Sequence, residues 1–376
     1  MGNKNSGRQK TILFCPLDWG LGHASRDILI IQKLLDRKKY KIIIGADNAP
    51  YHLLKSEFPD LQFLRFPSFS IHYSGHYSLN IKILLQVPKI LYWIRKEHRM
   101  LKQIILQYEV DIVISDNRYG LWNKNIHTII ISHQIKIFLS SILGWFEPLV
   151  NLKVKKWLSK FDQCWVPDIK GENNLAGKLS HPEILPQNLR YIGPISRFQL
   201  TKNQKNLKLT KKYEVLIILS GPEPQRSILE NVLIRHFRKK ETPVLIVRGI
   251  PWQKKGKTIY GNISLVSHLP SDLLYTYISM AKYIICRAGY SSIMDLVILN
   301  KPAVLIPTPG QTEQEYLAQS LHSRKFFYRL EQKDLNFEKA FSEFSEYYPR
   351  NGFSENSFLD QAIEKLDMTL KKIENR

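Results

Sequence analysis

The sequence of 376 residues contains few cysteines and few acidic residues. Its three cysteines, Cys15, Cys164 and Cys286, lie far apart and form no CxxC pair. This pattern excludes a disulfide framework and a zinc site built on thiolates. The sequence also lacks an uninterrupted apolar run of about 18 residues, and its polar N-terminus lacks the apolar segment of a signal peptide. We therefore expect a protein of the cytoplasm with no membrane-spanning helix.

The shortage of acidic residues leaves a strongly basic protein, because 33 Asp and Glu face 55 Lys and Arg, for a formal net charge of +22. Such a charge attracts nucleic acids, anionic lipid surfaces and phosphorylated small molecules alike. Residues 79–102, and residues 138–152 with the lysines that follow, interleave basic and aromatic side chains, which is typical of a membrane-interface segment. No nucleic-acid-binding motif occurs, so we expect an anionic membrane surface as a partner rather than nucleic acid.

Apolar runs and helical stretches alternate in two blocks of the chain. The first block opens with a strand at residues 11–16 and a helix from about residue 24, and the second opens with a strand at residues 213–219. Short apolar runs between helices are typical of buried parallel strands, so we predict an α/β protein. The predicted divisions are a first domain at 10–198, a basic hinge at 199–212, a second domain at 213–350 and a C-terminal amphipathic helix within 351–376.

A glycine turn, Asp18-Trp19-Gly20-Leu21-Gly22-His23, joins the first strand to the first helix. The free N–H groups and the dipole at a helix start favour a phosphate, and ligands of open α/β sheets bind at this edge. His23 would face such a ligand. The GxG spacing and Asp47 also fit part of a dinucleotide site, although Ser25 stands where the third glycine belongs. An NAD-dependent oxidoreductase is therefore one alternative, but it leaves the motifs of the second block unexplained.

Two strand-to-helix junctions of the second block carry polar residues. Within Cys286-Arg287-Ala288-Gly289-Tyr290-Ser291-Ser292-Ile293-Met294-Asp295, the serines can hold a diphosphate at the helix start, and Asp295 can bind the hydroxyls of a ribose. Residues 307–315, PTPGQTEQE, offer side chains suited to sugar hydroxyls. These junctions and the glycine turn would meet at the same edge of two sheets, which predicts a ligand cleft.

These motifs resemble those of GT-B glycosyltransferases of family 28. The family includes the bacterial enzyme that adds N-acetylglucosamine to the lipid-linked peptidoglycan precursor, and uncharacterised relatives. RAGYSSIMD resembles the family's nucleotide site, PTPGQTEQEYLA its donor-sugar loop and GLGH its N-terminal loop. Residues 267–270 resemble the place where the family binds uracil, and residues 191–194 resemble the close of its N-terminal domain.

The resemblance implies two Rossmann-like domains that face each other across a cleft, with the C-terminal helix returning to the first domain. The first domain would bind the acceptor and the second the nucleotide sugar. Asp295 stands where the family usually has Glu, and Ala318 stands near an expected Asn, which leaves the transferred sugar open. The implied donor-binding residues are Ser220, Gly221, Arg226, Leu269, Arg287, Gly289, Ser291, Ser292, Asp295, Gln311 and Gln314, and the implied acceptor-binding residues are Gly20, Gly22, His133 and Gln134.

The sequence contains no Asp-x-Asp pair to hold a divalent cation, so we expect neither a metal nor a further cofactor. Helix starts and arginine would then stabilise the leaving diphosphate. The predicted reaction moves a hexose or N-acetylhexosamine from a UDP-sugar to a hydroxyl group by direct displacement. His23 is the first choice of base, because the ordinary pKa of histidine, about 6.5, suits proton transfer near neutrality. Asp18 and Asp116 are the other candidates.

The acceptor that we expect is lipid-linked or an envelope glycan, which would place the protein peripherally on the inner face of the cell membrane. A nucleotide-sugar epimerase of the same fold is a second alternative. It would need further carboxylates around the sugar, and no convincing set is visible in the sequence.

Overall fold

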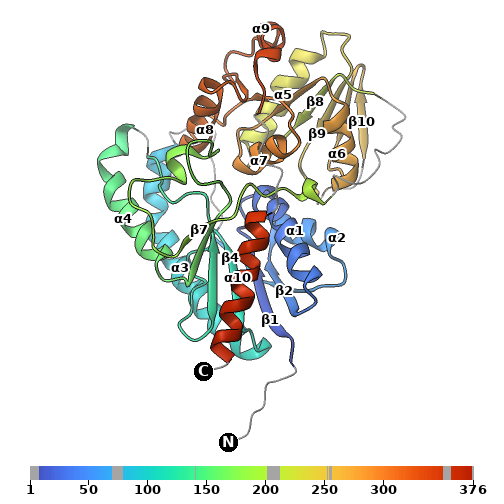
Figure 1. Ribbon diagram of the computed structural model, residues 1–376. Helices are drawn as coiled ribbons and strands as arrows, with labels where there is room; N and C mark the ends of the chain where they lie inside the picture. The colour runs from blue at the N-terminus through green and yellow to red at the C-terminus, as the bar shows by residue number, and fades with distance from the viewer. Residues whose placement is uncertain are drawn as a thin grey trace, which may run out of the picture.

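The structure is a computed structural model that describes residues 8–69, 79–139, 141–200, 212–251, 253, 256–349 and 357–374. Two seven-stranded sheets form two α/β domains, one above the other in Figure 1. Each sheet carries helices on both faces, so the predicted α/β architecture with two parallel-sheet domains is confirmed. Most of the predicted basic hinge, residues 201–211, lies outside the described residues.

The first sheet has the strand order β3-β2-β1-β4-β5-β6-β7, and all its pairings are parallel. Its central strands are apolar because both faces are covered: every residue of β4 and β5 is buried. The strands are β1 (Lys10–Cys15), β2 (Tyr40–Ala46), β3 (Gln62–Arg65), β4 (Ile112–Asp116), β5 (His127–Ile131), β6 (Gln163–Val166) and β7 (Leu189–Tyr191).

The second sheet has the order β10-β11-β9-β8-β12-β13-β14, and only the β10–β11 pairing among its described pairs is antiparallel. Its strands are β8 (Val215–Ile218), β9 (Val244–Val247), β10 (Lys257–Tyr260), β11 (Ile263–Val266), β12 (Tyr283–Cys286), β13 (Val304–Leu305) and β14 (Tyr328–Arg329). Four strands were not predicted from the sequence, and all of them are edge strands: β3, β7, β10 and β14. Most of their residues are partly or fully exposed, so they carry no apolar run.

The helices of the first domain are α1 (Leu21–Asp36), α2 (Asn48–Glu57), α3 (Leu79–Tyr108) and α4 (Glu147–Leu158). Those of the second are α5 (Gln225–Phe237), α6 (Ser271–Met280), α7 (Tyr290–Ile298), α8 (Thr312–Ser323) and α9 (Phe337–Ser342). Helix α1 begins three residues earlier than predicted, because Gly20 turns the chain with a φ of 102° and the helix starts directly after it.

The C-terminal helix α10 (Ser357–Glu374) crosses back to the first domain, as the resemblance implied, and lies along that domain in Figure 1. Its apolar residues Leu359, Ile363 and Leu366 are buried in the core formed by β1, β2, β4 and α1. Their helical spacing puts them on one face. Lys33 on α1 pairs with Asp360 at 3.0 Å. The first domain is therefore completed by residues from the end of the chain.

Candidate active site

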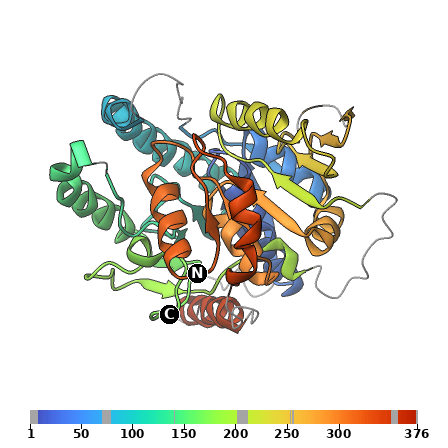
Figure 2. The same cartoon turned by 90° about the horizontal axis from the view of Figure 1, so that it is seen from above.

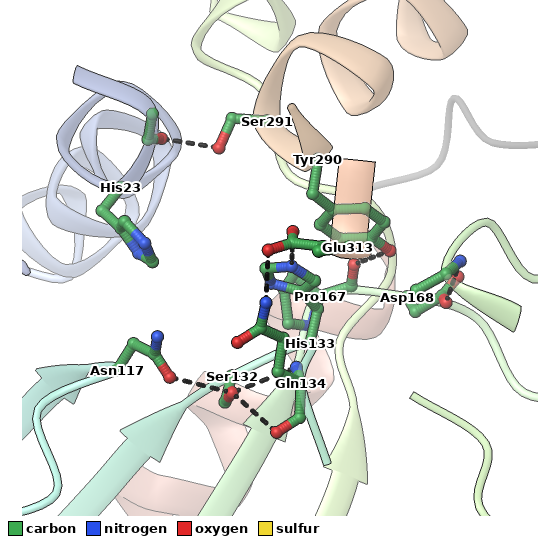
Figure 3. A network of polar contacts seen from close by, with 12 residues as sticks. His23, Asn117, Ser132, His133, Gln134, Pro167, Asp168, Tyr290, Ser291 and Glu313 are labelled. Atoms are coloured by element: carbon green, nitrogen blue, oxygen red, sulfur yellow. Dashed lines mark hydrogen bonds and ion pairs between the residues drawn. The ribbon is translucent and has the colours of Figure 1, made fainter. Parts of the chain in front are cut away.

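The starts of α1 and α7 meet where the two domains face each other. The Ser291 hydroxyl donates to the Gly22 carbonyl at 2.7 Å (Figure 3). A Cβ at Gly22 would lie 3.3 Å from that hydroxyl, so glycine permits the close approach. The glycine turn of the first domain and the serine motif of the second thus come together, as the sequence predicted for a ligand cleft.

His23 lies in the first turn of α1 and contacts Asp116, the last residue of β4. The distance between His23 Nδ1 and Asp116 Oδ2 is 2.9 Å. Burial by itself would raise the pKa of Asp116, but Arg26 and His23 hold it well below its usual range. His23 is 17% exposed, and its ring points toward the middle of the site in Figure 3. A buried anion beside a partly exposed histidine is an arrangement suited to general-base chemistry.

Asp18, the third candidate base, has other partners. It is buried, and its Oδ2 accepts from the Ser68 backbone N–H at 2.8 Å. Burial raises the pKa of Asp18. No described contact joins it to His23. The structure therefore brings together two of the candidate bases and ties Asp18 to the loop after β3.

His133 and Gln134, which follow β5, contact Glu313 at the start of α8. His133 Nε2 lies 2.8 Å from Glu313 Oε1, and the Gln134 amide donates to the other oxygen (Figure 3). Tyr290 stacks on the His133 ring with centroids 4.2 Å apart. Burial lowers the pKa of His133. Burial alone would raise the pKa of Glu313, but His133 keeps it below its ordinary value. The implied acceptor residues thus bind a carboxylate of the second domain.

Asp295, the implied ribose ligand, lies one turn after Ser291 on α7. Its carboxylate accepts from the Ser196 hydroxyl at 2.5 Å. Burial raises the pKa of Asp295 to about 6, although Arg197 and Ser196 oppose the rise. Ser196 precedes the predicted hinge, so this carboxylate is linked to the segment that joins the domains. Gly289 directly precedes α7, and Ser292 lies in its first turn.

The loop before α8 is held by its own polar groups. Gln314 is buried, and its side-chain oxygen accepts from the Thr308 backbone N–H at 2.9 Å. The Gln311 side-chain oxygen is buried and has no hydrogen-bond partner among the described residues. Such an orphaned acceptor is rare in folded proteins. An open surface pocket of about 410 Å³ is lined by Phe138, Leu139, Lys178, Thr312, Glu315 and Tyr316.

The remaining implied donor residues lie in or near the body of the second domain. Ser220 and Gly221 form the partly exposed turn after β8, where Gly221 has a φ of 96°. Leu269 is buried in the core. Arg226 is buried in ion pairs with Glu223 and Glu230.

Arg287 has backbone partners: its guanidinium donates to the carbonyls of Ile306, Pro307 and Gln225. Burial lowers the pKa of Arg287 to about 10. Both arginines, Arg226 and Arg287, therefore bind groups of the protein itself. Their part in donor binding stays a prediction.

Sequence reasoning missed Arg26, Glu313, Ser196 and Tyr290. Arg26 follows His23 by three residues, a spacing that puts both side chains on one helix face, so it could have been found. Glu313 immediately precedes the predicted Gln314. Ser196 gave no signal, because its partner lies 99 residues away in the sequence. Among the described residues, no group of three or more His, Cys, Asp or Glu side chains is placed to hold a metal.

Residues 215–356 match the family model described as the glycosyltransferase family 28 C-terminal domain. A curated relative from Caldanaerobacter subterraneus subsp. tengcongensis is 31% identical over 159 residues, which are 41% of this chain and 35% of the relative. Its name is UDP-N-acetylglucosamine-N-acetylmuramyl-(pentapeptide) pyrophosphoryl-undecaprenol N-acetylglucosamine transferase. The match therefore spans about a third of that relative's length.

Solved structures share the whole architecture at low sequence identity. The glycotransferase of kitacinnamycin has a TM-score of 0.62 and 14% identity, covering 95% of this chain and 99% of its own. A putative UDP-N-acetylglucosamine 2-epimerase from Listeria monocytogenes has a TM-score of 0.59 and 9% identity, covering 95% of each chain. These likenesses establish the fold. The chain has the predicted GT-B fold, and residues 215–356 of it match the model of the glycosyltransferase family 28 C-terminal domain.

Proposed function

We propose that the protein is a glycosyltransferase that moves a hexose or N-acetylhexosamine from a UDP-sugar to a hydroxyl group. The observation that carries this proposal is the meeting of the family 28 serine motif with the glycine turn and His23. Ser291 lies 2.7 Å from the Gly22 carbonyl, and His23 lies on the same helix turn as that glycine. The proposed diphosphate site and the proposed base would therefore be adjacent, as a transfer site requires.

The donor would lie along α7 and the loop before α8. Ser291, Ser292 and the free N–H groups at the start of α7 would hold the diphosphate, and Asp295 would bind the ribose. The orphaned oxygen of Gln311 would accept from a sugar hydroxyl, which gives that buried acceptor a partner. Leu269, Ser220 and Gly221 would border the base and the phosphates.

His23 would act as the base and Asp116 as the group that orients it. With its Nδ1–H donated to Asp116, His23 can take the acceptor proton on Nε2. The acceptor oxygen would then form its bond to the anomeric carbon while the bond from that carbon to the diphosphate oxygen breaks. The start of α7 would stabilise the charge on the leaving nucleoside diphosphate. This displacement uses groups of the chain and no metal.

The basic and aromatic stretches support an acceptor at a membrane. In both views α3 and α4 lie on the same side of the first domain (Figure 1, Figure 2). They meet at Trp122, which stacks on His98 of α3 at 4.2 Å and has Lys160 Nζ, just beyond α4, 4.3 Å from its ring centroid. Trp145 beside them is 73% exposed.

We infer peripheral binding to an anionic membrane on the cytoplasmic side and a lipid-linked or envelope-glycan acceptor. Within the described ranges, no helix combines the length and apolar character needed to cross a bilayer.

The test is thermal stabilisation by UDP, GDP, TDP and NAD, each with and without magnesium. We expect UDP to stabilise the protein without magnesium and Asp295→Asn to abolish the effect. Asp272→Asn is the matched control, because Asp272 is exposed and its side chain accepts from the Leu273 N–H at its own helix start. Stabilisation by NAD alone would overturn the proposal. Asp47, which an NAD site would need, pairs instead with Arg65 at 2.7 Å.

The products separate a transferase from an epimerase of the same fold. A transferase releases UDP rapidly when an acceptor is present. Without the acceptor it releases UDP only slowly, by transfer of the sugar to water. An epimerase converts the UDP-sugar into its epimer with no acceptor. If the protein and a UDP-sugar, without an acceptor, yield an epimeric UDP-sugar, the result would favour the epimerase.

A further inference from the structure

Arg26 contacts both histidines of the proposed site. It lies on α1 one turn after His23 and is 2% exposed. Its Nε donates to Asp116 Oδ2 at 2.9 Å, and its Nη2 donates to the other oxygen. The same guanidinium reaches both histidines of the site, with Nη2 2.9 Å from His23 Nδ1 and Nη1 3.3 Å from His133 Nδ1. One buried cation thus contacts the base, its carboxylate and the residue that binds Glu313.

The contact with Arg26 decides which nitrogen of His133 carries the proton. A guanidinium only donates hydrogen bonds, so His133 Nδ1 must be the unprotonated nitrogen. The proton then sits on Nε2 and is donated to Glu313 at 2.8 Å. The titratable and charged groups that face His133 are Arg26, His23, Tyr290 and Glu313. Burial lowers the pKa of His133, which agrees with a neutral ring.

His23 Nδ1 has two competing neighbours, because Asp116 accepts and Arg26 donates, each at 2.9 Å. A neutral ring can satisfy only one of them. If Nδ1 carries the proton, Asp116 accepts it and Nε2 is free to act as the base. If Nδ1 accepts from Arg26, Nε2 is protonated and cannot take the proton of an acceptor. Whether His23 Nδ1 donates to Asp116 or accepts from Arg26 therefore determines whether His23 Nε2 can take the proton of the acceptor.

We propose that Arg26 is a positioning residue that sets the ring protons of His23 and His133 and so couples the base to the Glu313 contact of the second domain. Its two-point bond to Asp116 uses the Nε hydrogen and one Nη2 hydrogen, and it fixes the carboxylate so that Oδ2 faces His23 Nδ1 and can accept its proton. A lysine keeps the charge but cannot reproduce the planar fork. The effect on turnover rests on the proposed function, whereas the ring-proton assignment does not.

The experiment compares Arg26→Lys with Arg118→Lys. Arg118 is the matched control, because it is equally buried and pairs with Glu97 at 3.0 Å, and its contacts with the described residues include neither His23 nor His133. The first readout is the ¹⁵N spectrum of histidine-labelled protein without substrate. We expect wild type and R118K to show His23 protonated on Nδ1 and His133 protonated on Nε2. In R26K we expect both rings to become mixtures.

A second variant, Glu313→Gln, tests the other end of the network. The glutamine oxygen still accepts from His133 Nε2–H, so the protonation of His133 should stay as in wild type.

The second readout is the rate of sugar transfer. Since general-base catalysis contributes about 10²–10⁴-fold, a partly misprotonated His23 should lower kcat by at least about tenfold in R26K, with a smaller change in the KM for the donor.

Unchanged ring protonation in R26K would overturn the proposal. Equal losses of kcat in R26K and R118K would also overturn it, because both would then reflect only the loss of a buried ion pair. If the wild-type protein transfers sugar from no UDP-sugar, the proposed function fails, and the spectra still decide the role of Arg26.

Discussion

The two domains contribute different chemistry to the same site. The first provides titratable groups, His23, Asp116 and His133, at the ends of buried strands and at a helix start. The second provides hydroxyls, a helix start and the carboxylate of Asp295. Under the proposed function, proton transfer would belong to the first domain and donor binding to the second. Glu313 is the exception, because it comes from the second domain and binds His133 of the first.

The largest expected effect comes from Asp116→Asn, which tests the first domain. It removes the anion that binds Arg26 at two points, and breaking a buried pair costs about 3–5 kcal/mol. We expect that loss in the free energy of unfolding measured with urea, together with a large loss of sugar transfer. A stability equal to wild type would show that the pair is not buried as described.

The pH dependence of stability checks the same carboxylate. The pKa of Asp116 is lowered in the folded protein, so its contribution is present above the unfolded value of about 3.9. That contribution is lost as the pH falls through the lower folded value. Asp116→Asn should therefore flatten part of the decline in stability below about pH 4.

The next effect distinguishes a loss of the transfer rate from a loss of UDP binding. His23→Ala should lower the rate of transfer by about 10²–10⁴-fold, because it removes the base. UDP binding, measured by calorimetry, should stay within about twofold of wild type, since the proposed donor site lies on the other domain. His52→Ala, at an exposed histidine of α2, is the control. Full activity of the His23 variant would remove this residue from the mechanism.

A smaller effect concerns the second domain and pH. The pKa of Asp295 is raised to about 6, so the folded state holds its proton more tightly than the unfolded chain. Its contribution to folding is thus favourable at low pH and is lost as the pH rises from about 4 to 6. Under the proposed function the carboxylate form of Asp295 binds the ribose, so UDP binding to wild type should weaken below about pH 6. Calorimetry should detect no UDP binding to Asp295→Asn on either side of that pH.

The smallest effect concerns the surface charge of the first domain. Replacing the exposed Lys153, Lys155 and Lys156 by Gln should weaken flotation with anionic vesicles, because each lysine near such a surface contributes about 1 kcal/mol. High salt should remove the difference between wild type and variant. The control replaces the second-domain lysines Lys239, Lys257 and Lys333, and it should leave flotation unchanged. Equal losses in both triple variants would show that only net charge matters.

The sequence predicted most of the buried framework. Fully buried strands such as β4 and β5 were visible as apolar runs, whereas edge strands such as β3 and β10 were not, because exposed strands need no apolar pattern. The serine motif and the glycine turn were also predicted, because a strand-to-helix junction is marked by residues that are neighbours in the sequence.

The sequence did not predict which polar residues of the two domains are partners. The contacts of Glu313 with His133 and of Ser196 with Asp295 join residues 180 and 99 positions apart. Pairing at such distances depends on how the two sheets face each other, which no local pattern contains.

The sequence by itself determined a basic, two-block α/β chain with three polar junctions, because apolar periodicity, glycine turns and charge are local properties. Only the tertiary structure decided which polar groups are partners. It placed one carboxylate beside His23 and tied another to the loop after β3, and it put Arg26 between two histidines. Burial then set the behaviour of these groups, since a charge removed from water depends on the few neighbours that the fold provides.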